Sequence, residues 1–247
     1  MTTTTEARDD LRSAALEAGE RFAAREGTVT SDLGGHEELT REILAWAAET
    51  FGEGLIVASN MQDAVLVELG AAARPGVDVL FLETGYHFVE TLGTRDAVAQ
   101  TYGVTIVQAE PELTVAEQDA TFGKDLFNVD PGACCTMRKV EPLKKTLARY
   151  DAWVTGVRRV EAPTRAATPL VTWDERHDLV KINPIAHWTD EQMDTYIREH
   201  AVLVNPLVEA GYPSIGCAPC TAKPAPGADP RSGRWAGFSK TECGLHG

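Results

Sequence analysis

The sequence predicts an α/β protein in which a mainly parallel central sheet is covered by helices on both faces. Between residues 36 and 155, short apolar stretches alternate with longer stretches of helical apolar spacing. This β-α-β order favours parallel strands, because each helix carries the chain back to the start of the sheet. From about residue 205 onward Gly and Pro become dense, so a C-terminal tail with little regular structure is expected.

Two amphipathic helices are expected before the first strand, over residues 5–26 and 36–51, because apolar side chains recur there at helical spacing between charged faces. We interpret the chain as a single domain of 247 residues. It divides into a helical N-terminal extension (1–38), an α/β core (39–205) and a C-terminal segment (206–247).

Four buried strands are predicted within the core, because short apolar runs are bounded by turn residues or polar stretches. They lie at residues 55–58, 77–82, 104–108 and 152–155, with helices between or before them at 63–73, 87–102 and 136–150. Ligands of parallel sheets bind where the strands end. The residues that follow each strand are therefore the first candidates for a site.

The charge distribution indicates a small anionic ligand. A formal net charge of −14 argues against a nucleic-acid partner, which would need clustered positive charge. Residues 131–165 nevertheless carry eight basic and three acidic side chains, and residues 221–247 carry four and two. These two basic windows contain or flank all five cysteines.

The N-terminus is polar and acidic, and no run approaches the ~18–20 apolar residues of a membrane span. We therefore expect a cytoplasmic protein with no membrane partner. In that compartment thiols stay reduced, and paired cysteines indicate metal or redox chemistry more often than disulfides.

The cysteines form an adjacent pair, Cys134 and Cys135, a C-x-x-C pair, Cys217 and Cys220, and a single residue, Cys243. Four thiolates in two pairs suit tetrahedral zinc or a cubane iron–sulfur cluster. Adjacent ligands crowd one small ion but can occupy two corners of a cluster, so the spacing favours the cluster. Four buried apolar cysteines are the remaining alternative. The single cysteine suits a nucleophile, although by itself it is equally compatible with a terminal surface residue.

Residues that follow the first two predicted strands are candidate ligands. The turn after the first strand can offer backbone N–H groups and the Ser59 hydroxyl to an anion, with Asp63 as a helix cap. An ordinary βα connection would have the same sequence. After the second strand, Leu82 can offer its main chain to a purine, and Gly85 permits a close approach of the backbone. A glycine turn capped by Thr84 explains that segment equally well.

Three arginines, Arg158, Arg159 and Arg165, follow the strand predicted at 152–155. Guanidinium groups bind phosphate and sulfate through paired hydrogen bonds, so this loop is a candidate oxyanion site. A solvated loop is the alternative for any one of them.

These motifs together resemble the assimilatory adenylylsulfate (APS) reductases of the thioredoxin-dependent sulfonucleotide reductase family. The resemblance extends from about residue 50 to 247 and is carried by CCTMRKVEPL, GVRRVEAPTR, GCAPCT and RSGRWAGFSKTECGLH. In this family, members with both cysteine pairs contain a [4Fe-4S] cluster and mostly use APS. Members without the pairs use the 3′-phosphorylated substrate, PAPS.

The resemblance implies an adenine nucleotide α-hydrolase-like fold and the reduction of APS to sulfite and AMP, in assimilatory sulfate reduction and cysteine biosynthesis. Cys243 would form an S-sulfocysteine intermediate that thioredoxin resolves. The four paired cysteines would ligate the cluster, and Lys139 would lie between cluster and substrate. The substrate-binding residues implied are Ser59, Leu82, Thr84, Gly85, Lys139, Arg158, Arg165, Arg231 and Arg234.

The sequence departs from the family pattern in two places. The turn after the first strand lacks the usual glycines, and the arginine loop has APTR in place of a longer glycine-containing version. Open alternatives are a PAPS or dual APS/PAPS reductase, an ATP-dependent adenylyl transferase and a zinc-bearing nucleotide-binding protein. A homo-oligomer is compatible with the sequence.

Overall fold

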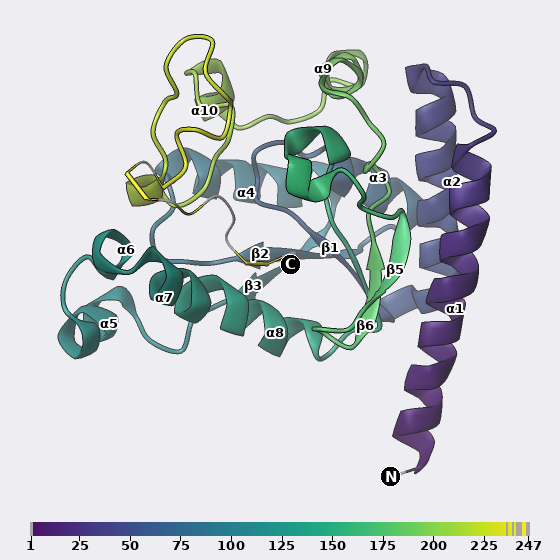
Figure 1. Ribbon diagram of the computed structural model, residues 1–247, viewed down its shortest axis with the longest axis horizontal. Helices are drawn as coiled ribbons and strands as arrows, with labels where there is room; N and C mark the ends of the chain where they lie inside the picture. Colours follow the sequence, from purple (N-terminus) through teal and green to yellow (C-terminus); the bar gives the residue numbers. More distant parts are fainter. Residues whose placement is uncertain (1, 236, 239, 241–243, 246–247) are drawn as a thin grey trace.

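The computed structural model describes residues 2–235, 237–238, 240 and 244–245. Its centre is a six-stranded sheet with the strand order β3-β2-β1-β4-β6-β5 (Figure 1). Every neighbouring pair is parallel except β5 and β6, which form an antiparallel hairpin. The strands are β1 (Leu55–Ala58), β2 (Asp78–Leu82), β3 (Thr105–Ala109), β4 (Ala152–Val154), β5 (Val171–Asp174) and β6 (Leu179–Ile182).

The helices follow the order that the sequence predicts for the core. They are α1 (Thr2–Glu26), α2 (Leu33–Phe51), α3 (Val65–Ala73), α4 (Val89–Tyr102), α5 (Val115–Phe122), α6 (Leu126–Val129), α7 (Pro131–Cys135), α8 (Glu141–Leu147), α9 (Asp190–Glu199) and α10 (Pro206–Glu209). Single turns occur at η1 (Gly52–Gly54), η3 (Arg159–Glu161), η4 (Pro163–Arg165) and η5 (Ala218–Cys220). In the part of the chain described here, none of the helices combines the length and the apolar character that crossing a membrane requires.

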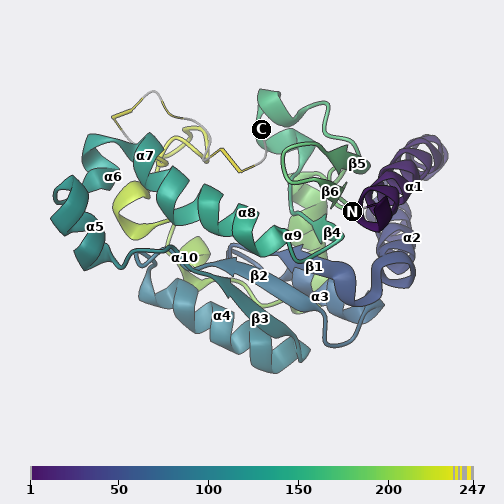
Figure 2. The same ribbon diagram turned by 90° about the horizontal axis from the view of Figure 1, so that it is seen from below.

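Helices cover both faces of the sheet, which confirms the predicted fold class. Side chains alternate between the two faces along each strand. Leu55 and Val57 of β1 belong to the larger core with α2, α3 and α4, whereas Ile56 packs with Leu143 of α8 in a smaller core on the other face. Figure 2 shows α8 above the sheet and α3 and α4 below it.

The helix predicted over 136–150 is divided in the structure. A π-helical segment, η2 (Thr136–Val140), separates α7 from α8. The Glu141 N–H bonds to the Thr136 carbonyl, five residues back. Pro142 follows and has no N–H to donate, so the regular α-helical ladder cannot continue through this point. The wider turn falls directly after the cysteine pair.

The β5–β6 hairpin and α9 were not predicted. The hairpin strands have four residues each and enclose a charged turn, so their apolar pattern is short. A capping box at the start of α9 was a readable signal, because the Thr189 side chain accepts from Gln192 N and the Gln192 side chain accepts from Thr189 N.

The first helix packs on the edge of the sheet. Ala15, Ala18 and Phe22 are buried in the larger core. A Cβ atom at Gly19 would lie 2.9 Å from the Val171 carbonyl oxygen, so glycine allows α1 to approach β5 closely. Helix α1 therefore shares a core with the sheet.

Candidate active site

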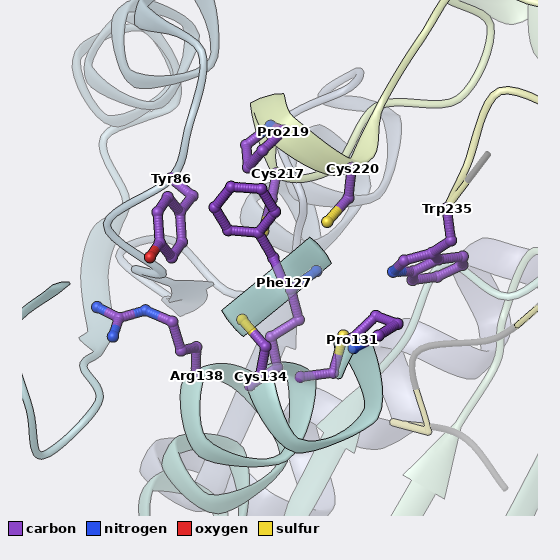
Figure 3. A pocket seen from close by; sticks show the side chains of 11 residues that line it. Tyr86, Phe127, Pro131, Cys134, Arg138, Cys217, Pro219, Cys220 and Trp235 are labelled. Carbon is purple, nitrogen blue, oxygen red and sulfur yellow. The ribbon is translucent and has the colours of Figure 1, made fainter. Parts of the chain in front are cut away.

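Two cavities lie side by side at the carboxyl ends of the parallel strands. The larger has a volume of about 630 Å³ and is bounded by the ends of β1, β2 and β4 and by parts of the C-terminal segment. The smaller is lined by the four paired cysteines and is shown in Figure 3. Lys139, Cys217 and Trp235 line both cavities, so the two spaces share a wall.

The adjacent cysteines reach the smaller cavity from α7. Asp130 caps this helix by accepting a hydrogen bond from Ala133 N at 2.9 Å, and Pro131 occupies its first turn. The short helix presents Cys134 and Cys135 together, and both are buried.

The C-x-x-C pair reaches the same cavity from the tight turn η5. Cys220 N donates to the Cys217 carbonyl at 2.9 Å, and Thr221 Oγ1 donates to the same carbonyl at 2.9 Å. Ala218 N donates to the Tyr86 carbonyl at 2.7 Å, which ties the turn to the segment after β2. The structure thus brings the two predicted pairs together, although 81 residues separate Cys135 from Cys217.

The surroundings disfavour thiolates unless positive charge is supplied. Burial, together with the neighbouring cysteines, raises the pKa of the Cys134 thiol to about 12, and Arg138 partly opposes this shift. Burial and Cys217 raise the pKa of Cys220 to about 11, and Lys139 opposes the shift. A metal centre would supply the missing charge, because metal ligation deprotonates thiols.

The four cysteines could hold a soft metal centre. None of the four cysteines forms a disulfide. Soft thiolate sulfur is the ligand of Fe–S clusters and of zinc. Over residues 2–235 and the few described after them, no group of three or more His, Cys, Asp or Glu side chains is arranged to hold a metal ion. The quartet shares one cavity, and its all-sulfur donor set is chemically suited to an iron–sulfur cluster or to zinc.

Eight of the nine predicted substrate-binding residues line the larger cavity: Ser59, Leu82, Thr84, Lys139, Arg158, Arg165, Arg231 and Arg234. The ninth, Gly85, lies beside the cavity with φ +73°, in the left-handed region. A Cβ atom there would meet Val115 Cγ2 at 2.9 Å and Arg138 Nη2 at 3.0 Å. Glycine is thus required for packing against Arg138 and Val115.

The glycine-free turn after β1 is stabilised by side-chain oxygens that accept hydrogen bonds from backbone N–H groups. Met61 N donates to Ser59 Oγ at 3.1 Å, and Met61 takes the left-handed conformation with φ 60°. Asp63 accepts from Val65 N at 3.2 Å, but the N-cap position of α3 is occupied by Ala64, so the prediction that Asp63 caps this helix is wrong by one residue. Burial raises the pKa of Asp63, and the nearby positive charge of Arg158 partly opposes this shift.

Thr84 and His87 organise the end of β2. The Thr84 Oγ1 atom accepts from Tyr86 N at 3.3 Å and from Cys217 Sγ at 3.4 Å. His87 Nε2 lies 2.8 Å from the Leu82 carbonyl oxygen, so the strand end predicted to meet a purine is already held by an imidazole. Burial lowers the pKa of His87, which keeps the ring neutral near pH 7.

Two of the three loop arginines face the larger cavity. Arg158 Nη2 lies 2.8 Å from Asp190 Oδ1 and Arg158 Nε lies 3.7 Å from Glu161 Oε1, while Arg165 also pairs with Glu161. The Nη1 atom of Arg158 is buried and has no hydrogen-bond partner among the described residues. Arg159 instead pairs with Glu26 of α1 at 2.5 Å, so its side chain anchors the first helix.

The two C-terminal arginines, Arg231 and Arg234, also line the larger cavity. Arg234 Nη1 donates to Ser214 Oγ at 3.3 Å and to the Ile215 carbonyl at 3.2 Å, and its guanidinium lies 4.7 Å from the Trp235 ring centre. Arg231 N donates to Asp229 Oδ1 at 2.7 Å, which fixes the turn that carries this residue. Basic groups therefore border the cavity from two separate segments.

Sequence reasoning missed Arg138 as a site residue and counted it only in the basic window. This buried side chain donates to the Thr84 carbonyl, to Gln118 Oε1 at 2.9 Å and to the Leu113 carbonyl at 3.3 Å. It also lines the cysteine cavity. Glu161, Asp190 and His87 were missed as well, because isolated titratable residues carry no motif.

The predicted nucleophile, Cys243, lies outside the described residues. Its neighbours in sequence, Gly244 and Leu245, are described, and Leu245 lines the larger cavity.

Comparison with known proteins agrees with this arrangement. Residues 54–223 match the phosphoadenosine phosphosulfate reductase domain family. An adenosine 5′-phosphosulfate reductase of Mycolicibacterium smegmatis is 68% identical over 205 residues, covering 83% of this chain and 87% of that protein. One from Mycobacteroides abscessus is 61% identical and covers 99% of this chain and 98% of its own length.

Among solved structures, a phosphoadenylyl-sulfate (PAPS) reductase from Candida auris, crystallised as a phosphate complex, superimposes with a TM-score of 0.63 at 27% identity. The match covers 74% of this chain and 90% of that one. The adenine nucleotide α-hydrolase-like fold is thereby confirmed. On its strand order, its cavities and these matches, the chain belongs to the phosphoadenosine phosphosulfate reductase domain family.

Proposed function

We propose that this chain reduces APS to sulfite and AMP in assimilatory sulfate reduction and cysteine biosynthesis. The observation that carries the proposal is the shared wall between a quartet of thiols and a larger cavity bordered by arginines. That cavity has room for a nucleotide, at about 630 Å³. Relatives at 60–68% identity bear the name adenosine 5′-phosphosulfate reductase, which favours APS over PAPS.

Adenosine would lie along the ends of β1 and β2, between Ser59 and the edge that includes Leu82, Thr84 and Gly85. The phosphosulfate would lie between the two arginine-bearing segments, where Arg158, Arg165, Arg231 and Arg234 supply positive charge. The buried Nη1 of Arg158 has no hydrogen-bond partner among the described residues, so its N–H groups can donate to such an anion. Lys139 lines both cavities and would contact the substrate from the cluster side.

The reaction proposed is a two-step sulfonate transfer through Cys243. The thiolate attacks the sulfur of APS, a bond forms between the two sulfur atoms, and the S–O bond to AMP breaks with its electron pair on the phosphate. A thioredoxin thiolate then attacks the Cys243 sulfur and expels sulfite. The second thioredoxin cysteine resolves the mixed disulfide, so the dithiol supplies both electrons.

Cys134, Cys135, Cys217 and Cys220 would hold a [4Fe-4S] cluster, as their common cavity and all-sulfur donor set support. When bound, the cluster would supply structural cross-links and a fixed local charge beside Lys139. With those four thiols committed, Cys243 is the fifth of five cysteines in the chain. An external dithiol such as cytoplasmic thioredoxin is therefore needed to release sulfite.

The test is anaerobic purification followed by iron and sulfide analysis and by sulfite assays with APS and with PAPS. We expect about four iron and four sulfide per chain, the content of a cubane cluster, and sulfite release from APS. Cys243→Ser should bind APS but form no covalent adduct by mass spectrometry. Zinc in the quartet, a preference for PAPS, or a sulfonate adduct in Cys243→Ser would each overturn the corresponding part of the proposal.

A further inference from the structure

The charged turn of the β5–β6 hairpin contacts the end of the chain. Arg176 Nη1 donates to the Gly244 carbonyl oxygen at 2.5 Å, across 68 residues of sequence. Arg176 thereby links this turn to the described part of the tail. The contact joins a side chain of the sheet edge to the residue after Cys243.

The turn that carries Arg176 is stabilised by hydrogen bonds among its own residues. Asp174 Oδ1 accepts from Arg176 N at 3.1 Å and from His177 N at 3.3 Å, and Asp174 Oδ2 lies 2.9 Å from His177 Nδ1. Asp178 completes the turn in the left-handed conformation with φ 57°. These hydrogen bonds fix the backbone of Arg176. Its side chain therefore projects from a defined point of the turn.

A second, apolar contact lies one residue further along the tail. Leu245 packs against the smaller core, whose buried members are Ile56, Leu80, Leu143, Leu147, Tyr150, Trp153 and Leu179. Leu245 also lines the larger cavity. The wall of the proposed substrate site is thus continuous with the surface on which the tail rests.

We propose that Arg176 and this apolar wall form a docking site for Gly244 and Leu245, and that the docking site positions Cys243 at the larger cavity. Cys243 is bonded directly to Gly244, so consecutive Cα atoms are held about 3.8 Å apart and the anchor limits the reach of the thiol. Arg176 is on this view a positioning residue that does not touch the substrate. The catalytic consequence rests on the proposed function, whereas the docking itself does not.

Docking is tested on the intact protein without substrate, by hydrogen–deuterium exchange of the peptide that contains residues 244–245. We expect Arg176→Ala and Leu245→Ala to speed exchange there by about tenfold, the order expected when one charge-assisted hydrogen bond or one buried side chain is lost. Arg12→Ala is the matched control, because Arg12 binds the same hairpin through Glu175 at 2.7 and 2.9 Å. Equal exchange in wild type and Arg176→Ala would overturn the docking site.

The positioning role is tested by single-turnover formation of the Cys243 sulfonate adduct from APS, followed by mass spectrometry. Arg176→Ala should slow adduct formation by about tenfold while the Kd for APS stays unchanged, and Arg176→Lys should restore part of the rate. Arg12→Ala should match wild type. An unchanged rate in Arg176→Ala, with faster exchange of the tail, would reject the positioning role. If wild type itself forms no adduct, the proposed function fails, and the exchange experiment still decides the docking site.

Discussion

Cys217 Sγ donates a hydrogen bond to Thr84 Oγ1 over 3.4 Å, and this contact connects the cysteine cavity to the end of β2. The Thr84 carbonyl accepts from Arg138 Nε, in the π-helical segment that follows the adjacent cysteines. Thr84 is only 1% exposed. One buried residue therefore receives hydrogen bonds from both cysteine-bearing segments while it lines the larger cavity.

Replacing Thr84 by Val should destabilise the protein while leaving its volume nearly unchanged. The substitution removes the acceptor for Tyr86 N and, in the cluster-free protein, the acceptor for the Cys217 thiol, and an unsatisfied buried donor costs about 1–3 kcal/mol. Urea unfolding should show a free energy of unfolding lower by about that amount. Thr84→Ser keeps the hydroxyl and is the control. Equal stability of the Val and Ser variants would contradict this prediction.

Replacing Arg138 by Lys should also cost stability, although the charge is retained. The guanidinium donates to three separate acceptors, on Thr84, Leu113 and Gln118, and a lysine ammonium lacks the planar fork that reaches them. We expect the free energy of unfolding to fall by about 2–3 kcal/mol. Each lost charge-assisted hydrogen bond is worth about 1.5–3 kcal/mol, and the lysine ammonium replaces some of the bonds that the guanidinium makes. The exposed Arg149 provides the control, and Arg149→Lys should change little. A similar small change in Arg138→Lys would show that the fork geometry is unimportant.

The order of the first two βα units was readable because β1 and β2 are largely buried. The run at residues 55–58 has no polar side chain, and neighbouring residues of β1 enter opposite cores. The β5–β6 hairpin was not readable for the opposite reason. Its strands include Thr172, Asp174 and Lys181, which are only partly buried, so no continuous apolar run marks them.

The part of the candidate site that has a local sequence pattern could be predicted. Cysteine spacing and strand ends identify residues by type and position along the chain, and these were found. Arg138 was missed because its partners Gln118 and Thr84 lie 20 and 54 residues away. Arg159 was grouped with the other two arginines of the candidate oxyanion loop, but its ion-pair partner, Glu26, belongs to α1, whose packing against β5 has no sequence motif. Contacts of this range depend on the fold itself.

Replacing Glu161 by Gln should strengthen anion binding in the larger cavity. The carboxylate lies 3.7 Å from Arg158 Nε and also pairs with Arg165, so it competes with any incoming phosphosulfate for the same guanidinium groups. Gln keeps an acceptor for Arg158 N, which now donates to Glu161 Oε2 at 3.2 Å. We expect the Kd for AMP and APS to fall by about three- to tenfold at low salt, the scale of one screened charge interaction near a surface.

Isothermal titration calorimetry at 20 and 200 mM salt (about 22 and 7 Å Debye length) measures that change. The gain should shrink at the higher salt concentration. Glu191→Gln, an exposed position on α9, controls for the loss of one negative charge. Weaker binding in Glu161→Gln would mean that this carboxylate orients the arginines, and the competition argument would be wrong.

Replacing Asp63 by Asn should stabilise the protein at neutral pH and have little effect in acid. Burial raises the pKa of Asp63 above its ordinary value of 3.8, so the folded state retains a proton that the unfolded state releases. The resulting cost to folding is absent below pH 3.8, grows as pH rises toward the folded pKa, and is constant above it. Asn avoids this cost and still accepts from Val65 N.

The pH dependence separates this cause from ordinary changes in packing. Urea unfolding of wild type and Asp63→Asn at pH 4, 6 and 8 should give a stability difference that increases with pH in favour of the variant. Asp32→Asn should behave in the opposite way, because hydrogen bonds from Gly35 N and the Thr30 hydroxyl lower the pKa of Asp32. Its charge stabilises the folded state above the ordinary pKa, and that benefit is lost as pH falls. A pH-independent difference for Asp63→Asn would show that the buried carboxylate carries no titration cost, and that its role is confined to accepting the hydrogen bond from Val65 N.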